Sequence, residues 1–126
     1  MIFYMNGYLW RVEFVSPDSD LLVDRTGTLT VATTDPTTHR IYLSNTLEGE
    51  FLIRVLVHEL GHSVMVSYSL LDDIHRMVYP NHWIEAEEWV CNFIANYGWQ
   101  IFTTAYSILG YGAIDILPNE LERLIV

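Results

Sequence analysis

The chain has very little cysteine and little positive charge. Cys91 is its only cysteine, so a disulfide within the chain and a four-cysteine zinc site are both excluded. Against 16 Asp and Glu there are only 6 Lys and Arg, which gives a formal net charge of -10. An acidic surface repels phosphate backbones, and we therefore expect no direct binding of nucleic acid.

The first residues lack the features of a secretory signal. Met1–Tyr4 contain no basic residue, and Asn6-Gly7 interrupts the apolar run at once. Together with the single cysteine, this favours the reducing cytoplasm as the location. No charged residue lies between Glu88 and Asp115, which raises the alternative of a membrane-bound protein. Polar residues and glycines punctuate that stretch, whereas a membrane-spanning helix is more purely apolar, so we expect a buried helix and no membrane association.

Length and composition predict one globular domain, residues 1–126. Hydrophobic residues make up 51% of the chain, which is enough apolar surface for one compact core. The first half is rich in strand and turn signals. Asn6-Gly7 predicts a type I′ hairpin, and Ser16-Pro17-Asp18 predicts the start of a short helix. The expected elements are strands at residues 3–5, 8–15, 28–34 and 40–44, and a short helix over residues 17–23.

The second half is expected to be helical. Apolar residues recur there at spacings of three and four. Asn45 and Glu48 form a candidate capping box before the first long helix, and Asn81 is a candidate cap for the second. The predicted fold class is therefore α+β, with a small, mostly antiparallel sheet packed on two long helices that carry the metal site. The expected helices span residues 47–70, 82–106 and 117–124.

The first of these helices contains the motif His58-Glu59-Leu60-Gly61-His62. Residues four apart lie one above the other on a helix face, so the imidazoles of His58 and His62 can bind one zinc ion. Glu59 is rotated from His58 by about 100°, which suits a general base for a water molecule that zinc has made acidic. Gly61 costs about 1 kcal/mol in a helix interior relative to alanine, which suggests that another segment packs closely against it.

A catalytic zinc site needs a third protein ligand and an open fourth position. A third histidine in the metzincin position is excluded, because that position holds a tyrosine. A glutamate on the following helix is the other common solution, and we predict Glu88. Cys91 on the same face is small enough for close helix packing, and Asn92 can orient a histidine ligand through a hydrogen bond. Glu87 shares its face with apolar residues that offer it no polar support, and Glu85 stays the alternative ligand.

The two motifs together resemble the ImmA/IrrE-type metallopeptidases of phages and mobile elements. Glu88-x-x-Cys91-Asn92-x-Ile94-Ala95 is similar to the family pattern Glu-x-x-Ala-Asn-x-Phe-Ala, with cysteine and isoleucine substituted. The broader gluzincins carry an acidic residue where this chain has Asn92. The resemblance covers about residues 28–98 and implies a minimal gluzincin with a zincin-like fold. It also implies a cytoplasmic endopeptidase that cleaves a regulatory protein, often a helix-turn-helix repressor of the same element.

Further expectations concern the reaction and its alternatives. The oxyanion of the tetrahedral intermediate is commonly stabilised by histidine or tyrosine, and the candidates His75, Tyr79 and His82 stay open. The expected function is a zinc endopeptidase with Glu59 as general base; a catalytically silent zinc-containing interaction or sensing module is the alternative. A purely structural zinc site has no need of Glu59, which favours the enzyme. The strand at residues 28–34 is the expected exposed edge that pairs with an extended substrate.

Overall fold

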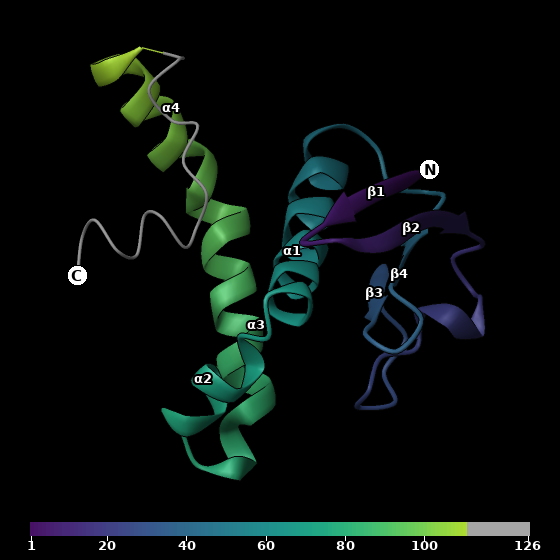
Figure 1. The fold of residues 1–126 in the computed structure, drawn as a ribbon. Helices are drawn as coiled ribbons and strands as arrows, with labels where there is room; N and C mark the ends of the chain where they lie inside the picture. The colour runs from purple at the N-terminus through teal and green to yellow at the C-terminus, as the bar shows by residue number, and fades with distance from the viewer. Residues whose placement is uncertain (111–126) are drawn as a thin grey trace. The chain divides into compact units, whose positions relative to one another are not determined.

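The computed structural model describes residues 1–110, and the helix expected over residues 117–124 lies outside them. The chain divides into two compact units, residues 1–96 and 97–126; the single domain expected over residues 1–126 stays a prediction. The elements are strands β1 (Ile2–Met5), β2 (Tyr8–Val15), β3 (Ala32–Asp35) and β4 (Arg40–Ser44), helices α1 (Gly49–Ser67), α2 (Leu71–Arg76), α3 (Trp83–Phe93) and α4 (Trp99–Leu109), 3-10 turns at Asp20–Leu22 and Pro80–His82, and a π-helical segment at Ile94–Gly98 (Figure 1).

The first unit confirms the α+β class. Its four strands form one sheet in the order β1-β2-β4-β3. The β1–β2 and β3–β4 pairs are antiparallel, but β2 and β4 run parallel, so the sheet is mixed. The parallel pair arises because the chain passes from β2 to the outer position of β3 and returns through a tight turn into β4. Asn6 and Gly7 have φ values of 50° and 81°, as the expected type I′ hairpin requires.

Two elements of the first half differ from the sequence-based expectation. The strand expected at residues 28–34 begins only at Ala32. Thr30 donates its backbone N–H to the carbonyl oxygen of Leu22 at 2.9 Å, and Leu29 forms an isolated bridge with Val23. Leu29 and Thr30 therefore pair with the end of the 3-10 turn and the residue after it instead of with β4. That turn covers Asp20–Leu22, and its cap is Ser19, whose hydroxyl accepts a hydrogen bond from the Leu21 backbone N–H. The helix expected over residues 17–23 is therefore shorter and starts later.

The helical half also differs in its boundaries. Helix α1 begins at Gly49, and the capping box of Asn45 and Glu48 is not formed; the backbone N–H of Asn45 instead donates to the carbonyl oxygen of Val15 at the end of β2. The stretch between the two expected long helices contains α2, and α3 has no side-chain cap from Asn81. The stretch expected as one helix over residues 82–106 consists of α3, the π-helical segment Ile94–Gly98 and α4, so its α-helical hydrogen bonding is interrupted within the stretch.

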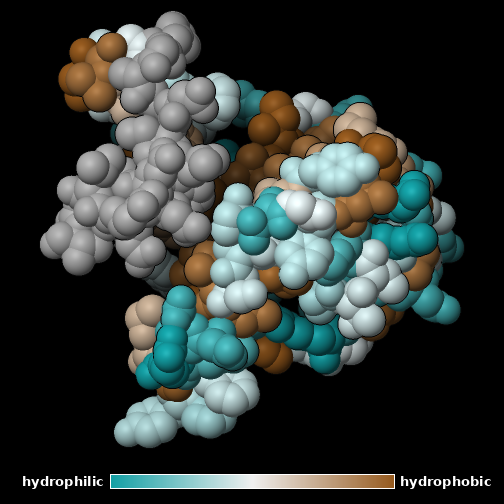
Figure 2. All heavy atoms as spheres, in the orientation of Figure 1, coloured by the Kyte–Doolittle hydropathy of each residue, from teal (hydrophilic) through white to brown (hydrophobic). Residues whose placement is uncertain are grey.

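The core of the first unit lies between the sheet and α1. Trp10 and Ile41 are fully buried, and one face of α1 packs on them through apolar side chains such as Leu56. The indole N–H of Trp10 donates to the hydroxyl of Ser67 at 2.8 Å, which fixes the end of α1 on the sheet. Helix α1 thus lies between the sheet and α3 (Figure 1). On the face drawn in Figure 2, hydrophilic side chains cover much of the described surface, with hydrophobic patches between them.

Candidate functional site

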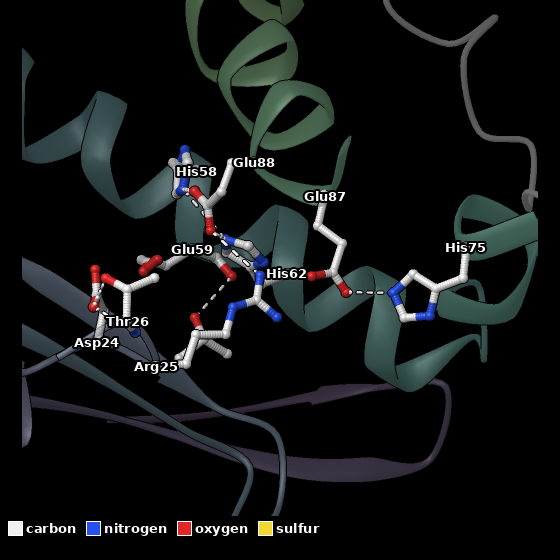
Figure 3. Close-up of polar contacts among 10 residues, drawn as sticks. Asp24, Arg25, Thr26, His58, Glu59, His62, His75, Glu87 and Glu88 are labelled. Atoms are coloured by element: carbon white, nitrogen blue, oxygen red, sulfur yellow. Dashed lines mark hydrogen bonds and ion pairs between the residues drawn. The ribbon is translucent and has the colours of Figure 1, made fainter. Parts of the chain in front are cut away.

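Three side chains from α1 and α3 converge where these two helices face each other (Figure 3). Nε2 of His58 lies 2.9 Å from Oε2 of Glu88, and Nε2 of His62 lies 3.2 Å from Oε1 of the same carboxylate. The two Nε2 atoms are 3.2 Å apart. The structure therefore brings together the two histidines and the glutamate that the sequence proposes as ligands, on the two helices expected to carry them.

Close packing of the two helices makes this convergence possible. A Cβ atom added to Gly61 would lie 3.1 Å from Sγ and 3.5 Å from Cα of Cys91. The prediction that another segment packs closely on Gly61 is thus confirmed, and the segment is α3. Because Glu88 precedes Cys91 by one turn, the same close approach brings its carboxylate to the histidines.

The donor set fits a bound cation. With ligand bonds of about 2.1 Å, the edges of a zinc tetrahedron are about 3.4 Å long, and the separations among His58, His62 and Glu88 are 2.9 to 3.2 Å. Without a cation, the facing nitrogens can approach the carboxylate only by carrying protons. Accordingly, the hydrogen bond to Glu88 raises the pKa of His58, and the hydrogen bonds from both histidines hold the pKa of Glu88 well below its usual range.

Glu59 lies beside these ligands and is almost fully buried. Its side chain lines the same cavity, and within the described residues its Oε2 atom has no hydrogen-bond partner. Burial raises the pKa of this carboxyl group. A buried carboxylate oxygen without a partner is costly, which makes Glu59 a candidate for proton transfer or for contact with a bound polar group.

Cys91 adds a fourth donor atom. Its thiol is fully buried, as expected for a packing residue, and Sγ together with a nitrogen of His58 and one of His62 forms a group whose atoms all lie within 4.8 Å of one another. Burial raises the pKa of the thiol to about 12. Two donor sets thus share the histidines, one completed by Glu88 and one by Cys91. The Glu88 set is the tighter, since its contacts are 2.9 and 3.2 Å.

Of the two remaining candidates, Asn92 lies at the cavity with the histidines and Glu85 lies away from it. Asn92 lines the cavity, and its side-chain hydrogen bond contributes to the raised pKa of His58, which agrees with the supporting role expected for it. Glu85 instead has a side chain that is 75% exposed and pairs with His82 at 3.2 Å. The position of Glu85 therefore offers no support for it as the third ligand.

The three residues considered for oxyanion stabilisation all lie outside the cavity. Its described lining includes none of His75, Tyr79 and His82. The Nε2 atom of His75 contacts Oε1 of Glu87 at 3.1 Å, and Tyr79 is 79% exposed. The structure does not bring these residues to the ligands.

Sequence reasoning missed a second charged cluster next to the ligands. Glu87, expected to lack polar support, is almost fully buried and contacts His75 on one oxygen and Arg25 on the other (Figure 3). Nη2 of Arg25 lies 2.5 Å from Oε2 of Glu87 and 3.6 Å from Oε1 of Glu88. The Arg25–Glu87 contact has the distance of an ion pair but not the direction of a hydrogen bond. The expectation for Glu87 was wrong because its partners come from a distant loop and from α2.

The cavity that contains these groups has a volume of about 730 Å³. One wall is the edge strand β3 with the loop before it, and the other consists of α1 and α3. The hydroxyl of Thr34 in β3 donates to the carbonyl oxygen of Glu59 at 3.4 Å, so this strand lies next to the turn of α1 that carries Glu59. The arrangement therefore combines a candidate metal centre, a buried base and an open strand edge.

Two further findings bear on identity. No described helix combines the length and the apolar character that a membrane span requires. Compared with known protein families, with curated proteins and with solved structures, the chain matches none.

Proposed function

We propose that this chain is a zinc-dependent endopeptidase with a zincin-like fold, of the ImmA/IrrE type. One observation carries the proposal: a triangle of two imidazole nitrogens and a carboxylate, with edges of 2.9 to 3.2 Å, stands beside a buried glutamate whose Oε2 has no partner among the described residues. His58, His62 and Glu88 are the proposed ligands, and Glu59 is the proposed general base. The residue types and their roles are those that zinc peptidases need.

The chemistry follows from the position of Glu59. Bound zinc would polarise the carbonyl group of the scissile peptide bond and lower the pKa of a water molecule to about 7. Glu59 takes a proton from the attacking water on its carboxylate and returns it to the nitrogen of the leaving amine, so the proton balance closes. Burial raises the pKa of Glu59, which brings it nearer to the neutral range where a group can act both as base and as acid.

The substrate is proposed to be a protein segment in extended conformation. Within residues 1–110, strand β3 pairs with β4 and with no other strand, and its residues line the cavity together with Glu59. An added strand can therefore use the free backbone groups of β3 for hydrogen bonds. By the family resemblance, the substrate is a cytoplasmic regulatory protein such as a helix-turn-helix repressor from the same phage or mobile element.

A paired substitution tests the proposal. Glu59→Gln keeps the shape of the side chain but cannot take up the proton, and loss of general-base catalysis typically costs about 10²- to 10⁴-fold in rate. Glu50→Gln, on an exposed position of the same helix, makes the same chemical change away from the cavity. The zinc-loaded variants are incubated with the regulator encoded beside this gene, and cleavage is followed by mass spectrometry. Equal cleavage by Glu59→Gln and Glu50→Gln would contradict the role of Glu59.

Cys91 favours a second candidate function, the catalytically silent zinc module. If its sulfur completes the coordination of the ion, no position is left for water and the site becomes a closed structural one. Cobalt substitution distinguishes the two, because a thiolate bound to Co²⁺ gives an intense near-ultraviolet charge-transfer band that nitrogen and oxygen ligands do not. The peptidase proposal predicts the same spectrum for the wild type and Cys91→Ala. A band that disappears in Cys91→Ala would favour the closed module.

A further inference from the structure

The loop after the first 3-10 turn presents Arg25 to the cavity. Oδ1 of Asp24 accepts hydrogen bonds from the backbone N–H of Thr26 at 2.8 Å and of Thr28 at 3.0 Å, and the backbone N–H of Gly27 donates to the carbonyl oxygen of Asp24 at 3.0 Å. These bonds close the turn on both sides of Arg25. The loop thereby directs the guanidinium of Arg25 toward the carboxylates of α3 (Figure 3).

The contacts of Arg25 hold its guanidinium in place but leave some of its N–H donors available. Glu87 holds one nitrogen at 2.5 Å and is itself held by His75, whose ring stacks on Trp83 with centroids 4.4 Å apart. A guanidinium has five N–H donors, while the structure pairs a single nitrogen, Nη2, with Glu87 and Glu88. The Arg25 side chain is 47% exposed, so further donors are available to a molecule in the cavity.

The position of Arg25 relative to the ligands suits a developing negative charge. Nη2 lies 3.6 Å from Oε1 of Glu88, and this oxygen lies 3.2 Å from Nε2 of His62. Among the described residues, the cavity is lined by two cationic side chains of Lys or Arg type, Arg25 and Arg54, and Arg25 is the one with a contact to a ligand carboxylate.

We propose that Arg25 is a catalytic residue that donates hydrogen bonds to the carbonyl oxygen of the scissile peptide bond and stabilises the oxyanion formed there. This inference rests on the proposed peptidase function and fills the role for which His75, Tyr79 and His82 lie in the wrong place. Glu87 orients the guanidinium through its ion pair with Nη2. Preorganised donors of this kind gain strength where water is excluded, and removal of one typically costs about 10²- to 10³-fold in kcat.

Two small probes test the inference without a known substrate. Inorganic phosphate is a tetrahedral anion that resembles the charge and shape of the oxyanion, whereas acetohydroxamate is a metal chelator that needs no guanidinium. Their dissociation constants are measured by calorimetry on zinc-loaded wild type, Arg25→Gln, Arg25→Lys and Arg54→Gln. Arg54→Gln is the matched control, since it removes the same charge from another part of the cavity lining.

The expected result is selective. Arg25→Gln should weaken phosphate binding about 10-fold, the size of one hydrogen bond to a charged group, and should change acetohydroxamate binding less than about 2-fold; Arg25→Lys should lie between. Unchanged phosphate affinity in Arg25→Gln, or an equal loss in Arg54→Gln, would overturn the inference while leaving the peptidase proposal intact. A parallel loss of acetohydroxamate binding would identify Arg25 as purely structural and overturn it too. Failure of the wild type to bind zinc or either probe would overturn the peptidase proposal together with it.

Discussion

The contact between Gly61 and Cys91 predicts an unusual response to a single methyl group. Gly61 has ordinary helical φ, so alanine can adopt its backbone conformation and should gain about 1 kcal/mol of helix propensity. The added Cβ would, however, lie 3.1 Å from Sγ of Cys91, which is closer than carbon and sulfur normally approach. Overpacking of this kind typically costs about 1–3 kcal/mol.

The two effects should nearly cancel in the wild type and separate when the sulfur is removed. We expect Gly61→Ala to change the free energy of unfolding by less than about 1 kcal/mol in the wild-type background. In the Cys91→Ala background the nearest atoms of residue 91 are Cα and Cβ at 3.5 Å, an ordinary contact, so the same substitution should stabilise by about 1 kcal/mol. The coupling energy between the two positions should therefore be about 1–2 kcal/mol.

The assay is urea unfolding of the four metal-free proteins, followed by far-ultraviolet circular dichroism. Metal-free protein isolates helix packing from ligand binding. Because a shifted α3 would carry Glu88 away from His58 and His62, zinc affinity should also fall in Gly61→Ala and recover in the double variant. Equal effects of Gly61→Ala in both backgrounds would refute the reasoning that Cys91 sets the distance between α1 and α3.

Three other outcomes are expected. In metal-free protein, the hydrogen bond to Glu88 raises the pKa of His58, and burial raises the pKa of Glu59. Each group contributes its full stabilisation below its pKa in the unfolded chain and loses it as the pH rises through its pKa in the folded protein. The Tm of the metal-free protein should therefore be lower at about pH 8 than at about pH 6. Zinc must displace the protons on the histidines, so its stabilisation should be larger at the higher pH, and a Tm increase on adding zinc that is larger at about pH 6 would contradict this. Ser67→Ala leaves the buried indole N–H of Trp10 without its acceptor and should lower the free energy of unfolding by about 1–3 kcal/mol. The same substitution should cost less in a Trp10→Phe background, where there is no N–H to leave without an acceptor.

Local patterns predicted the parts of this molecule that depend on local spacing. The placement of His58 and His62 on one face follows from the helical period, and the hairpin at Asn6-Gly7 follows from the φ values that these residue types tolerate. The position of Glu88 beside the two histidines was predictable for a related reason: a small residue one turn after Glu88 indicates close helix packing. Predicting these features does not require knowing which segments that are distant in the sequence come into contact.

The cluster of Arg25, Glu87 and His75 was missed because its members come from a loop, α3 and α2, which only tertiary structure brings together. The late start of β3 has a related cause, since the backbone N–H of Thr30 bonds to the carbonyl oxygen of Leu22, a contact across the intervening turn that strand propensity alone does not indicate. The first turn of α1 was misplaced because the backbone of Asn45 continues the sheet contacts instead of capping a helix. In each case a long-range hydrogen bond or ion pair outweighs a plausible local signal.

The central claim is that one zinc ion is bound by His58, His62 and Glu88. Metal-free protein is titrated with zinc against a competing chromophoric chelator, using the wild type, Glu88→Ala and Glu85→Ala. We predict one zinc per chain, equal affinity for the wild type and Glu85→Ala, and a loss of more than about 100-fold for Glu88→Ala, since removal of even a supporting partner of a ligand typically costs about 10- to 100-fold. Full affinity in Glu88→Ala, with loss in Glu85→Ala, would contradict the ligand assignment; absence of stoichiometric zinc in the wild type would contradict the metal centre itself.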